Sequence, residues 1–481
     1  MNVVVLIIDT LRRDYLGAYG NDWIETPNID NLAKESMVYD FSFVHSYPTI
    51  PHRTDVMTGQ YGEPFHPWMP LRHDRKTFVE ELGKTGWCTQ LIHDTPHLVN
   101  GGHNFDWPFH AWTPVRGAEV DRPWIDDSRE WLSNWKQDPL FDFADIDVME
   151  NRTVLTYSRA NRGREKHEDW NCARLFLTAS QWLKDNSSRD NFFLWVDCFD
   201  PHEPWDAPPE FMQKYDQREG YDGTIDPRSF VLRNHEDLPA EARDHVAAQY
   251  AAKVSWVDHW VGQFLDTLDE TGLSENTAVL FTADHGTNVG ERGRFGKGYP
   301  VREQEVRTPF MIRKPKGPTG QSSIIVQPQD IYATVMGMLD RPVPDALDSH
   351  DVLALEEAGS GGPRDVAIAG NRADGWDGDA EKILFTVLDR NWYLEVAAKP
   401  QFCRLTALGS LEEVSDQHPD LVEEMHRKAI DELEAHGAHP QIVEWLRSHG
   451  ASEWPTDIAY WNDYPGPEGY SAYFGRLYTG E

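Results

Sequence analysis

The sequence predicts an α/β fold: a large, mostly parallel sheet sandwiched by helices, followed by a small C-terminal domain with an antiparallel sheet and one helix. Short apolar, β-branched runs alternate with helix-period segments between residues 3 and 340, which is typical of a parallel sheet covered on both faces. Beyond the small, flexible stretch at residues 359–363, short alternating runs indicate antiparallel strands. A chain of 481 residues also has room for more than one hydrophobic core.

Short apolar runs give the central strands of the large sheet. The predicted strands are residues 3–8, 88–92, 192–196, 278–281 and 310–312. A helix is predicted to begin at Thr77, because Glu80 three residues later completes a capping box. Between Tyr250 and Leu268, apolar residues recur every three or four positions, which predicts a long helix with one buried face.

The C-terminal part reads as a smaller unit. Residues 383–388, 392–396 and 404–408 are predicted to be antiparallel strands, followed by one helix from Pro419 to about Glu434. We therefore expect a large α/β domain over residues 1–360 and a small α+β domain over residues 361–450. Residues 451–481, rich in Pro, Gly, Tyr and Trp, are expected to form an ordered wrap or a contact in a homo-oligomer.

The net charge of the chain limits the macromolecules that it can bind. Lys and Arg number 45 against 80 Asp and Glu, a net charge of −35 that repels nucleic acid and anionic membranes. We therefore expect neither as a partner. An acidic composition with few lysines fits an ordinary acidic enzyme and a protein of a high-salt cytoplasm equally well, because salt screens self-repulsion.

Composition also bears on class and location. Apolar residues make up 40% of the chain and aromatics 12%, which excludes a disordered protein. The apolar run at residues 3–8 is too short to span a bilayer and has no basic flank, so we expect a cytoplasmic location. The four cysteines lie far apart without a CxxC pair, which suggests neither a disulfide framework nor a cysteine zinc site.

Acidic residues stand at the ends of three predicted strands. Asp9 follows the first strand, Asp197 follows the strand at 192–196, and Asp284-His285 follows the strand at 278–281. Ligands of open α/β sheets bind outside the carboxyl ends of the strands. Carboxylates gathered there repel one another unless a cation lies among them, so the pattern favours a divalent metal with the imidazole as a further ligand.

A second pattern surrounds Thr49. Pro48 and the helix-compatible residues up to Thr58 place Thr49 at or just before a helix N-terminus. Its hydroxyl could simply cap that helix. The same position favours an alkoxide or a bound oxyanion, and Arg53 one turn later supplies a cation for such an anion.

These motifs resemble those of the sulfatases of the alkaline phosphatase superfamily, in order and with suitable spacing. The matching segments are residues 9–14 (DTLRRD), 26–33 (TPNIDNLA), 49–59 (TIPHRTDVMTG) and 282–286 (TADHG). His202-Glu-Pro-Trp looks like the family's His-x-Pro segment, and Lys297 follows the Asp-His-Gly loop as it does there. The similarity covers most of residues 1–340, and it implies an alkaline phosphatase-like fold with residues 1–360 as the catalytic domain.

The resemblance also implies roles for individual residues. Asp9, Asp284 and His285 would bind one divalent metal ion (Mn, Zn, Ca or Mg), with the Thr49 hydroxyl as nucleophile on the same metal. Four further residues occupy positions at which members of the family have side chains that bind the transferred anion or protonate the leaving group. These are Arg53, His97, His202 and Lys297. Asn288 is a weaker candidate as a metal ligand, and Asp197 is one as a supporting residue.

Three departures from the family pattern bear on the reaction. Sulfatases oxidise a Cys or Ser to formylglycine, and Thr49 cannot yield that aldehyde. Thr10 replaces the second of two consecutive aspartates, and Thr95 stands where a lysine commonly precedes the histidine at position 97. The site therefore looks closer to the phosphodiesterase and phosphonate-ester branch of the superfamily.

We expect a metal-dependent hydrolase of a small anionic phosphate or sulfate ester, with phosphodiesters and phosphonate esters favoured. One alternative is a sulfatase that hydrolyses a Thr49 sulfate directly, without formylglycine. The other is a catalytically silent, sulfatase-like binding protein in which Thr49 only caps its helix.

Overall fold

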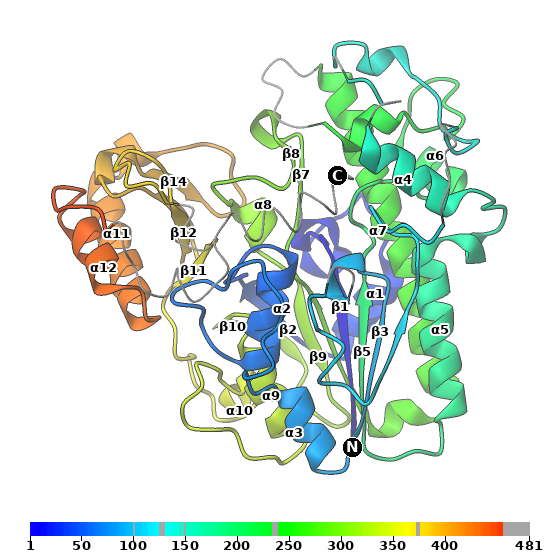
Figure 1. Cartoon of the computed structure of the whole chain (residues 1–481), viewed down its shortest axis with the longest axis horizontal. Coiled ribbons are helices and arrows are strands. Elements are labelled where there is room, and N and C mark those ends of the chain that lie inside the picture. The colour runs from blue at the N-terminus through cyan, green and yellow to red at the C-terminus, as the bar shows by residue number, and fades with distance from the viewer. Residues whose placement is uncertain are drawn as a thin grey trace.

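The structure, a computed structural model, describes residues 1–99, 102–124, 130–144, 146–148, 151–232, 239–371 and 376–455. Within these ranges the chain forms an eight-stranded sheet, a four-stranded sheet and a two-stranded ribbon. Figure 1 shows the large sheet between two layers of helices, with the small sheet to one side. Most of the predicted tail, from residue 456 onward, lies outside the described residues.

The large sheet is mostly parallel, as predicted, and its order is β10-β2-β9-β6-β1-β5-β3-β4. Its strands are β1 (Asn2–Ile8), β2 (Met37–Ser42), β3 (Cys88–His93), β4 (Ala111–Pro114), β5 (Phe192–Cys198), β6 (Thr277–Ala283), β9 (Phe310–Arg313) and β10 (Gly320–Val326). All five predicted runs are strands. In the centre, β1 is hydrogen-bonded to β5 on one side and to β6 on the other, both in parallel.

One strand departs from the prediction. The run at residues 310–312 was expected among the parallel strands, but β9 runs antiparallel to both β6 and β2. The chain leaves β6 at the carboxyl edge of the sheet, and the ribbon β7 (Asn288–Val289) and β8 (Phe295–Gly296) and the short helix α8 (Glu303–Val306) come before β9. Because no crossover helix returns the chain to the opposite edge, β9 starts at the carboxyl edge and has to run back.

Helices cover the two faces of the large sheet. One face packs against α1 (Pro27–Lys34), α4 (Arg152–Asn161), α5 (Asn171–Asp185), α6 (Pro209–Tyr215) and α7 (Ala240–Glu270), and the other against α2 (Thr49–Thr58), α3 (Phe78–Lys84), α9 (Asp330–Met338) and α10 (Val352–Glu357). Alternate residues of β1 enter the two cores: Val4 and Leu6 face the first layer, and Val3 and Val5 the second. A strand buried on both faces needs the continuous apolar run that the sequence has.

The helices predicted to begin at Thr77 and to include residues 250–268 are confirmed. Thr77 is the N-cap of α3, and its Oγ1 accepts a hydrogen bond from the Glu80 backbone N–H at 3.2 Å. The predicted apolar stripe lies within α7, and Tyr250, Val257 and Leu268 on it are completely buried.

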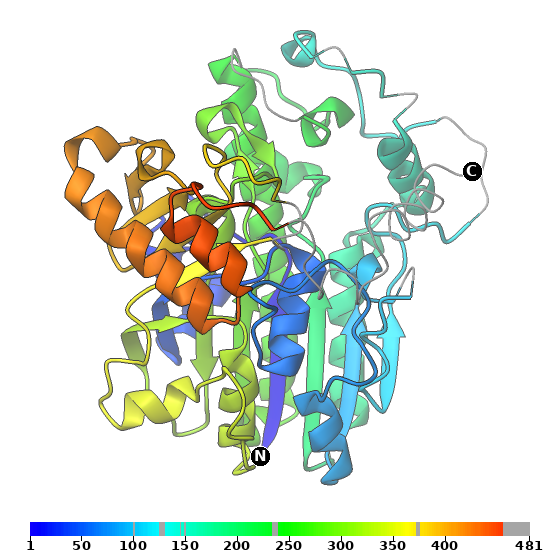
Figure 2. The same ribbon diagram turned by 60° about the vertical axis from the view of Figure 1, so that its left-hand side comes forward.

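The small sheet is antiparallel, as predicted. It consists of β11 (Ala367–Gly370), β12 (Phe385–Leu388), β13 (Trp392–Val396) and β14 (Arg404–Ala407), and it packs against α11 (Pro419–Ala435) and α12 (Pro440–Arg447). Figure 2 brings these two helices to the front. The helix predicted from Pro419 to about Glu434 is confirmed as α11, and the sequence did not predict α12, which begins at Pro440 after a short turn through Gly437.

The small sheet is joined to the segment that leads into α2. The Tyr47 N–H donates to the Gly370 carbonyl at 2.9 Å, and the Gly370 N–H donates to the His45 carbonyl at 3.0 Å. The described cysteines are free, and no helix in the described ranges has the length and apolar character needed to cross a bilayer.

Candidate active site

The three acidic strand ends come together at the carboxyl edge of the large sheet. Asp197, Asp9 and Asp284 follow or end the neighbouring strands β5, β1 and β6, and all three are completely buried. The Thr10 backbone N–H donates to Asp284 Oδ1 at 3.0 Å, which ties the ends of β1 and β6 together. The sequence placed these carboxylates correctly because parallel neighbours end at the same edge.

Asp9, Asp284 and His285 form a cluster suited to a cation. One ligand atom from each lies within 4.8 Å of the others, and Asp9 Oδ1 has no hydrogen-bond partner among the described residues. Burial, followed by the neighbouring Asp284, raises the pKa of Asp9 well above its usual range. Two carboxylates, an imidazole and a nearby hydroxyl are donors that suit Mn²⁺, Zn²⁺ or Mg²⁺, so these residues fit the predicted divalent metal.

His285 is oriented as a ligand. Its Nδ1 donates to the Gly286 carbonyl at 2.7 Å, which leaves the lone pair of Nε2 free. Nε2 lies 4.0 Å from Asp9 Oδ1 and 3.4 Å from Thr49 Oγ1. Burial lowers the pKa of His285 to about 4, so the ring is neutral near pH 7.

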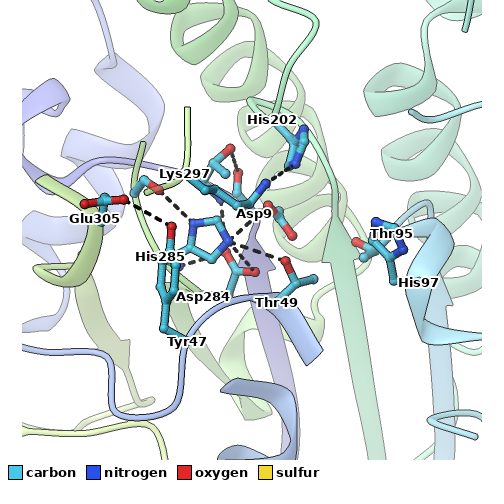
Figure 3. A network of polar contacts seen from close by, with 12 residues as sticks. Asp9, Tyr47, Thr49, Thr95, His97, His202, Asp284, His285, Lys297 and Glu305 are labelled. Carbon is cyan, nitrogen blue, oxygen red and sulfur yellow. Dashed lines mark hydrogen bonds and ion pairs between the residues drawn. The ribbon is translucent and has the colours of Figure 1, made fainter. Parts of the chain in front are cut away.

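Thr49 is the first residue of α2 and is 1% exposed. Its side chain does not cap the helix: the N-cap position is occupied by Pro48, and the hydroxyl faces His285 (Figure 3). The positive end of the α2 dipole lies at this residue and stabilises negative charge on its oxygen. The geometry therefore favours the interpretation of Thr49 as a reactive hydroxyl over that of a simple cap.

Arg53 connects α2 to all three strand ends. Its guanidinium makes two hydrogen bonds to Asp197, at 2.7 and 2.9 Å, another to Asp284, and a longer contact of 3.4 Å with Asp9. Burial opposes its charge, but Asp197 and Asp284 raise the pKa of Arg53 well above its usual value. Because the side chain is completely buried among carboxylates, its predicted contact with a transferred anion stays a prediction.

Asp197 holds other side chains of the site by hydrogen bonds, and its role as a supporting residue stays a prediction. Besides Arg53 it accepts hydrogen bonds from Thr95 Oγ1 at 2.5 Å and from Trp195 Nε1 at 3.0 Å. Thr95 immediately precedes the short 3-10 helix that carries His97, so Asp197 links that helix to the base of the site.

A second group of residues contains Lys297 and His202. Lys297, directly after β8, contacts His202 Nε2 through its ammonium group (Figure 3). His202 Nδ1 lies 2.9 Å from the Glu203 carbonyl and 3.0 Å from Glu203 Oε2, and its ring stacks on Phe199 with centroids 4.1 Å apart. The Lys297 ammonium thus lies against the His202 imidazole, and Glu203 and Phe199 fix the orientation of that imidazole.

In the view of Figure 3, His97 lies beside Thr95 and apart from the cation cluster. Its Nε2 is 2.7 Å from Glu119 Oε2, and Trp68 packs edge-on against its ring. Burial acts to raise the pKa of Glu119, but the neighbouring groups, His97 above all, lower it to about 2. The carboxyl group is therefore ionised.

The Asn288 amide makes its hydrogen bond outside the cation cluster. On β7, its Nδ2 donates to the Gly296 carbonyl at 2.9 Å, next to Lys297, while its Oδ1 has no partner among the described residues. Its proposed role as a ligand stays a prediction.

The sequence reasoning missed Glu119, Glu203, Thr95 as a hydrogen-bond donor, and Glu305. Glu305 accepts from the Gly298 N–H at 2.7 Å and from the Tyr47 hydroxyl at 3.3 Å, so it fixes the loop that carries Lys297. Glu203 had a signal, because it stands beside His202 in the quoted motif. Glu119 had none, because only tertiary structure brings it to His97.

Comparisons with known proteins identify the family of this chain. The family model described as Sulfatase matches residues 1–341. An arylsulfatase of Clostridium perfringens (strain 13 / Type A) is 26% identical over 476 residues, covering 90% of this chain and 94% of that protein.

Solved structures agree on the fold. A phosphonate monoester hydrolase from Silicibacter pomeroyi is 19% identical with a TM-score of 0.66, covering 91% of this chain and 96% of its own. The phosphonate monoester hydrolase of Agrobacterium radiobacter is 20% identical with a TM-score of 0.62 and the same coverages. The solved structures thus share the fold, and the family match over residues 1–341 shows that the chain belongs to the sulfatase family and is an ester hydrolase.

Proposed function

We propose that this protein hydrolyses a small anionic ester with Thr49 as a covalent nucleophile and one divalent metal ion bound beside it, and that phosphodiesters or phosphonate esters are its preferred substrates. The observation that carries the proposal is the position of Thr49 Oγ1, at the start of α2 and 3.4 Å from Nε2 of a neutral His285. Asp9 Oδ1, which has no hydrogen-bond partner among the described residues, completes the surroundings of this hydroxyl.

Asp9, Asp284 and His285 would hold the metal, with Thr49 Oγ1 as a further ligand. When bound, such an ion polarises the ester and lowers the pKa of a neighbouring hydroxyl. The α2 N-terminus stabilises negative charge on the hydroxyl oxygen of Thr49. The Arg53 guanidinium donates to the Thr49 backbone carbonyl at 3.0 Å and adds a positive charge nearby, so both favour attack by the Thr49 alkoxide.

In the first half-reaction the Thr49 oxygen forms a bond to phosphorus or sulfur, and the bond to the leaving oxygen breaks. Lys297 offers an ammonium to the anion, and His202 or His97 gives a proton to the leaving oxygen. In the second half-reaction water attacks the same centre, the bond to Thr49 breaks, and the threonine regains its proton.

A second candidate is a sulfuric ester hydrolase that works without formylglycine. It is supported by the family match and by the arylsulfatase of Clostridium perfringens, whose name refers to sulfate esters. The preference for phosphorus rests on Thr49, which cannot form the aldehyde from which sulfatases expel sulfate. Rates on aryl esters with the same leaving group, a phosphodiester against a sulfate, decide between the two.

Thr49→Ala tests the covalent step. We expect kcat to fall by at least about a thousandfold, because the nucleophile is lost, while Thr49→Ser retains part of the activity. Quenching the wild type during turnover of a phosphodiester should leave phosphoryl mass on the peptide that contains Thr49.

The matched control is Thr54→Ala, which removes a hydroxyl from the same helix that donates only to the Ile50 carbonyl. It should keep nearly full activity. A folded, metal-loaded Thr49→Ala protein that turns over at the wild-type rate would refute the covalent mechanism.

A further inference from the structure

Each of the two candidate acid histidines has its own glutamate. His97 Nε2 lies 2.7 Å from Glu119 Oε2, and His202 Nδ1 lies 3.0 Å from Glu203 Oε2. Neither glutamate belongs to the cation cluster, which consists of Asp9, Asp284 and His285. Their chemical role is therefore separate from metal binding.

Both glutamates are ionised although they are largely buried. Their side chains are 21% and 13% exposed, for Glu119 and Glu203 respectively. Burial raises both pKa values, but the paired histidine, and Lys297 in addition, lowers the pKa of Glu119 to about 2 and that of Glu203 further. Because Lys297 acts on both, the two carboxylates lie in the field of the same ammonium group.

The backbone around both glutamates is arranged to admit them. Glu119 has a φ of 43°, a left-handed conformation that is uncommon outside glycine, and the surrounding loop is fixed by two hydrogen bonds between Arg116 and Asp121. At Gly296, next to Lys297, a Cβ atom would lie 2.9 Å from Glu203 Oε1. A side chain at position 296 would therefore displace the Glu203 carboxylate.

A charge count shows what these carboxylates do. Asp9, Asp197 and Asp284 carry three negative charges, which Arg53 and a divalent cation would balance. Beyond this cluster the Lys297 ammonium contributes one positive charge, and Glu119 and Glu203 contribute two negative charges beside the candidate acid histidines. A second negative charge on the substrate would therefore meet two carboxylates and one ammonium.

We infer that Glu119 and Glu203 are specificity-determining residues that adapt the site to a transferred group with one negative charge. Such groups are the phosphodiester, the phosphonate monoester and the sulfate monoester. A phosphate monoester carries a second charge above its second pKa of about 6 and would be disfavoured. This inference rests on the proposed function, since it concerns the anion that the same site takes.

The test measures binding of two small anions to the metal-loaded protein at pH 8 by calorimetry. Dimethyl phosphate carries one charge and methyl phosphate two. We expect the wild type to prefer dimethyl phosphate. We expect Glu119→Gln and Glu203→Gln each to shift the ratio of the two dissociation constants at least tenfold toward methyl phosphate, because each removes one negative charge and keeps a side chain of the same shape.

The matched control is Glu210→Gln, which removes a glutamate from an exposed pair with His167 and should leave the ratio unchanged. If the glutamates only orient the imidazoles, their variants weaken both anions equally, and the inference is wrong. It is also wrong if the wild type binds neither anion. A shifted ratio in a protein that hydrolyses no ester would instead overturn the proposed function and leave this inference standing.

Discussion

Asp9 and Asp284 show how burial sets the chemistry of single residues in this site. Both carboxyl groups are completely buried, and the pKa of Asp9 is raised by burial and by Asp284. His285 and then Arg53 lower the pKa of Asp284 in spite of its burial. Since Arg53 makes its closer contacts with Asp284 and Asp197, Asp9 is the carboxylate left to be neutralised by a cation.

Asp284→Asn should remove the metal and the activity together and leave the fold intact. The amide keeps the shape of the carboxyl but loses the charge that attracts a cation, and the residue lies at the edge of the sheet. Elemental analysis of the purified variant measures the loss. Asp266→Asn, at an exposed position of α7, is the control and should keep its metal. Equal metal content in Asp284→Asn and the wild type would refute the ligand assignment.

Lys297→Ala should lower kcat/KM at least tenfold, which corresponds to about 1.4 kcal/mol of lost transition-state stabilisation. The variant loses the ammonium group that contacts His202 and that would hold the transferred anion in the proposed mechanism. Steady-state kinetics on the best ester found provide the measurement, with Lys184→Ala, an exposed lysine on α5, as the control. Wild-type kinetics in the Lys297 variant would place that side chain outside the reaction.

At the scale of secondary-structure elements, α1 depends on a carboxylate from another helix. Thr26, at the N-cap position of α1, makes no side-chain capping bond. Asp258 of α7 takes over that role: its Oδ1 accepts from the Ile29 N–H at 2.8 Å, and its Oδ2 from Asn28 Nδ2 at 2.8 Å. The long helix thus fixes the start of the short one.

Asp258→Ala should lower the free energy of unfolding by about 2 kcal/mol, because it leaves buried donors of α1 without an acceptor. Urea unfolding measures the change. Asp266→Ala introduces the same residue two turns later on the exposed face of α7 and should change the stability by less than about 0.5 kcal/mol. If both variants unfold at the same urea concentration, Asp258 does not cap α1.

The same scale explains which elements could be predicted. The predicted strands of the large sheet are short, mostly apolar runs. The strands β10 and β4 were not predicted, because β10 (Gly320–Val326) begins with a polar half and β4 is an exposed strand that ends in Pro114. Edge strands of this kind are stabilised by their pairing partner and have little signal of their own. The direction of β9 depended on the path of the loop before it.

The residues of the candidate site likewise include some that could be predicted from the sequence and some that could not. The proximity of Asp9, Asp197 and Asp284 could be predicted from the sequence, because neighbouring parallel strands end at the same edge of a sheet. Glu119 and Thr95 could not, because they come from irregular segments whose approach to the site depends on the packing of the whole domain.

For the whole molecule, the junction between the two sheets lies beside the segment that leads to Thr49. Tyr61 and His436 stack there, with ring centroids 3.5 Å apart, and His45 contacts both rings. Phe43 and Tyr47 share an apolar cluster with strands of the small sheet. The small sheet therefore supports the approach to α2 as well as its own core.

The junction should be sensitive to acid. Burial, followed by the charge of Arg364, lowers the pKa of His436 to about 3, so the folded protein keeps this ring neutral where the unfolded chain, with an ordinary value of 6.5, binds a proton. The free energy of unfolding therefore falls as the pH drops from about 6.5 toward 3, by up to about 1.4 kcal/mol per pH unit for this group.

His436→Phe keeps the stack with Tyr61 and cannot be protonated. Urea unfolding at several pH values between 7 and 4 should show a smaller loss of stability for the variant than for the wild type. Parallel stability curves for the two proteins would mean that His436 does not contribute to acid sensitivity.

Thr49 has a consequence for how this enzyme comes into being. With a threonine as its nucleophile, the proposed catalyst is encoded completely by its gene, and folding and metal uptake are the last steps of its assembly. No enzyme that oxidises a side chain to formylglycine has to act on this position before the chain folds. An expression host that lacks such an enzyme would therefore yield a uniform preparation, in which every folded molecule carries the same nucleophile.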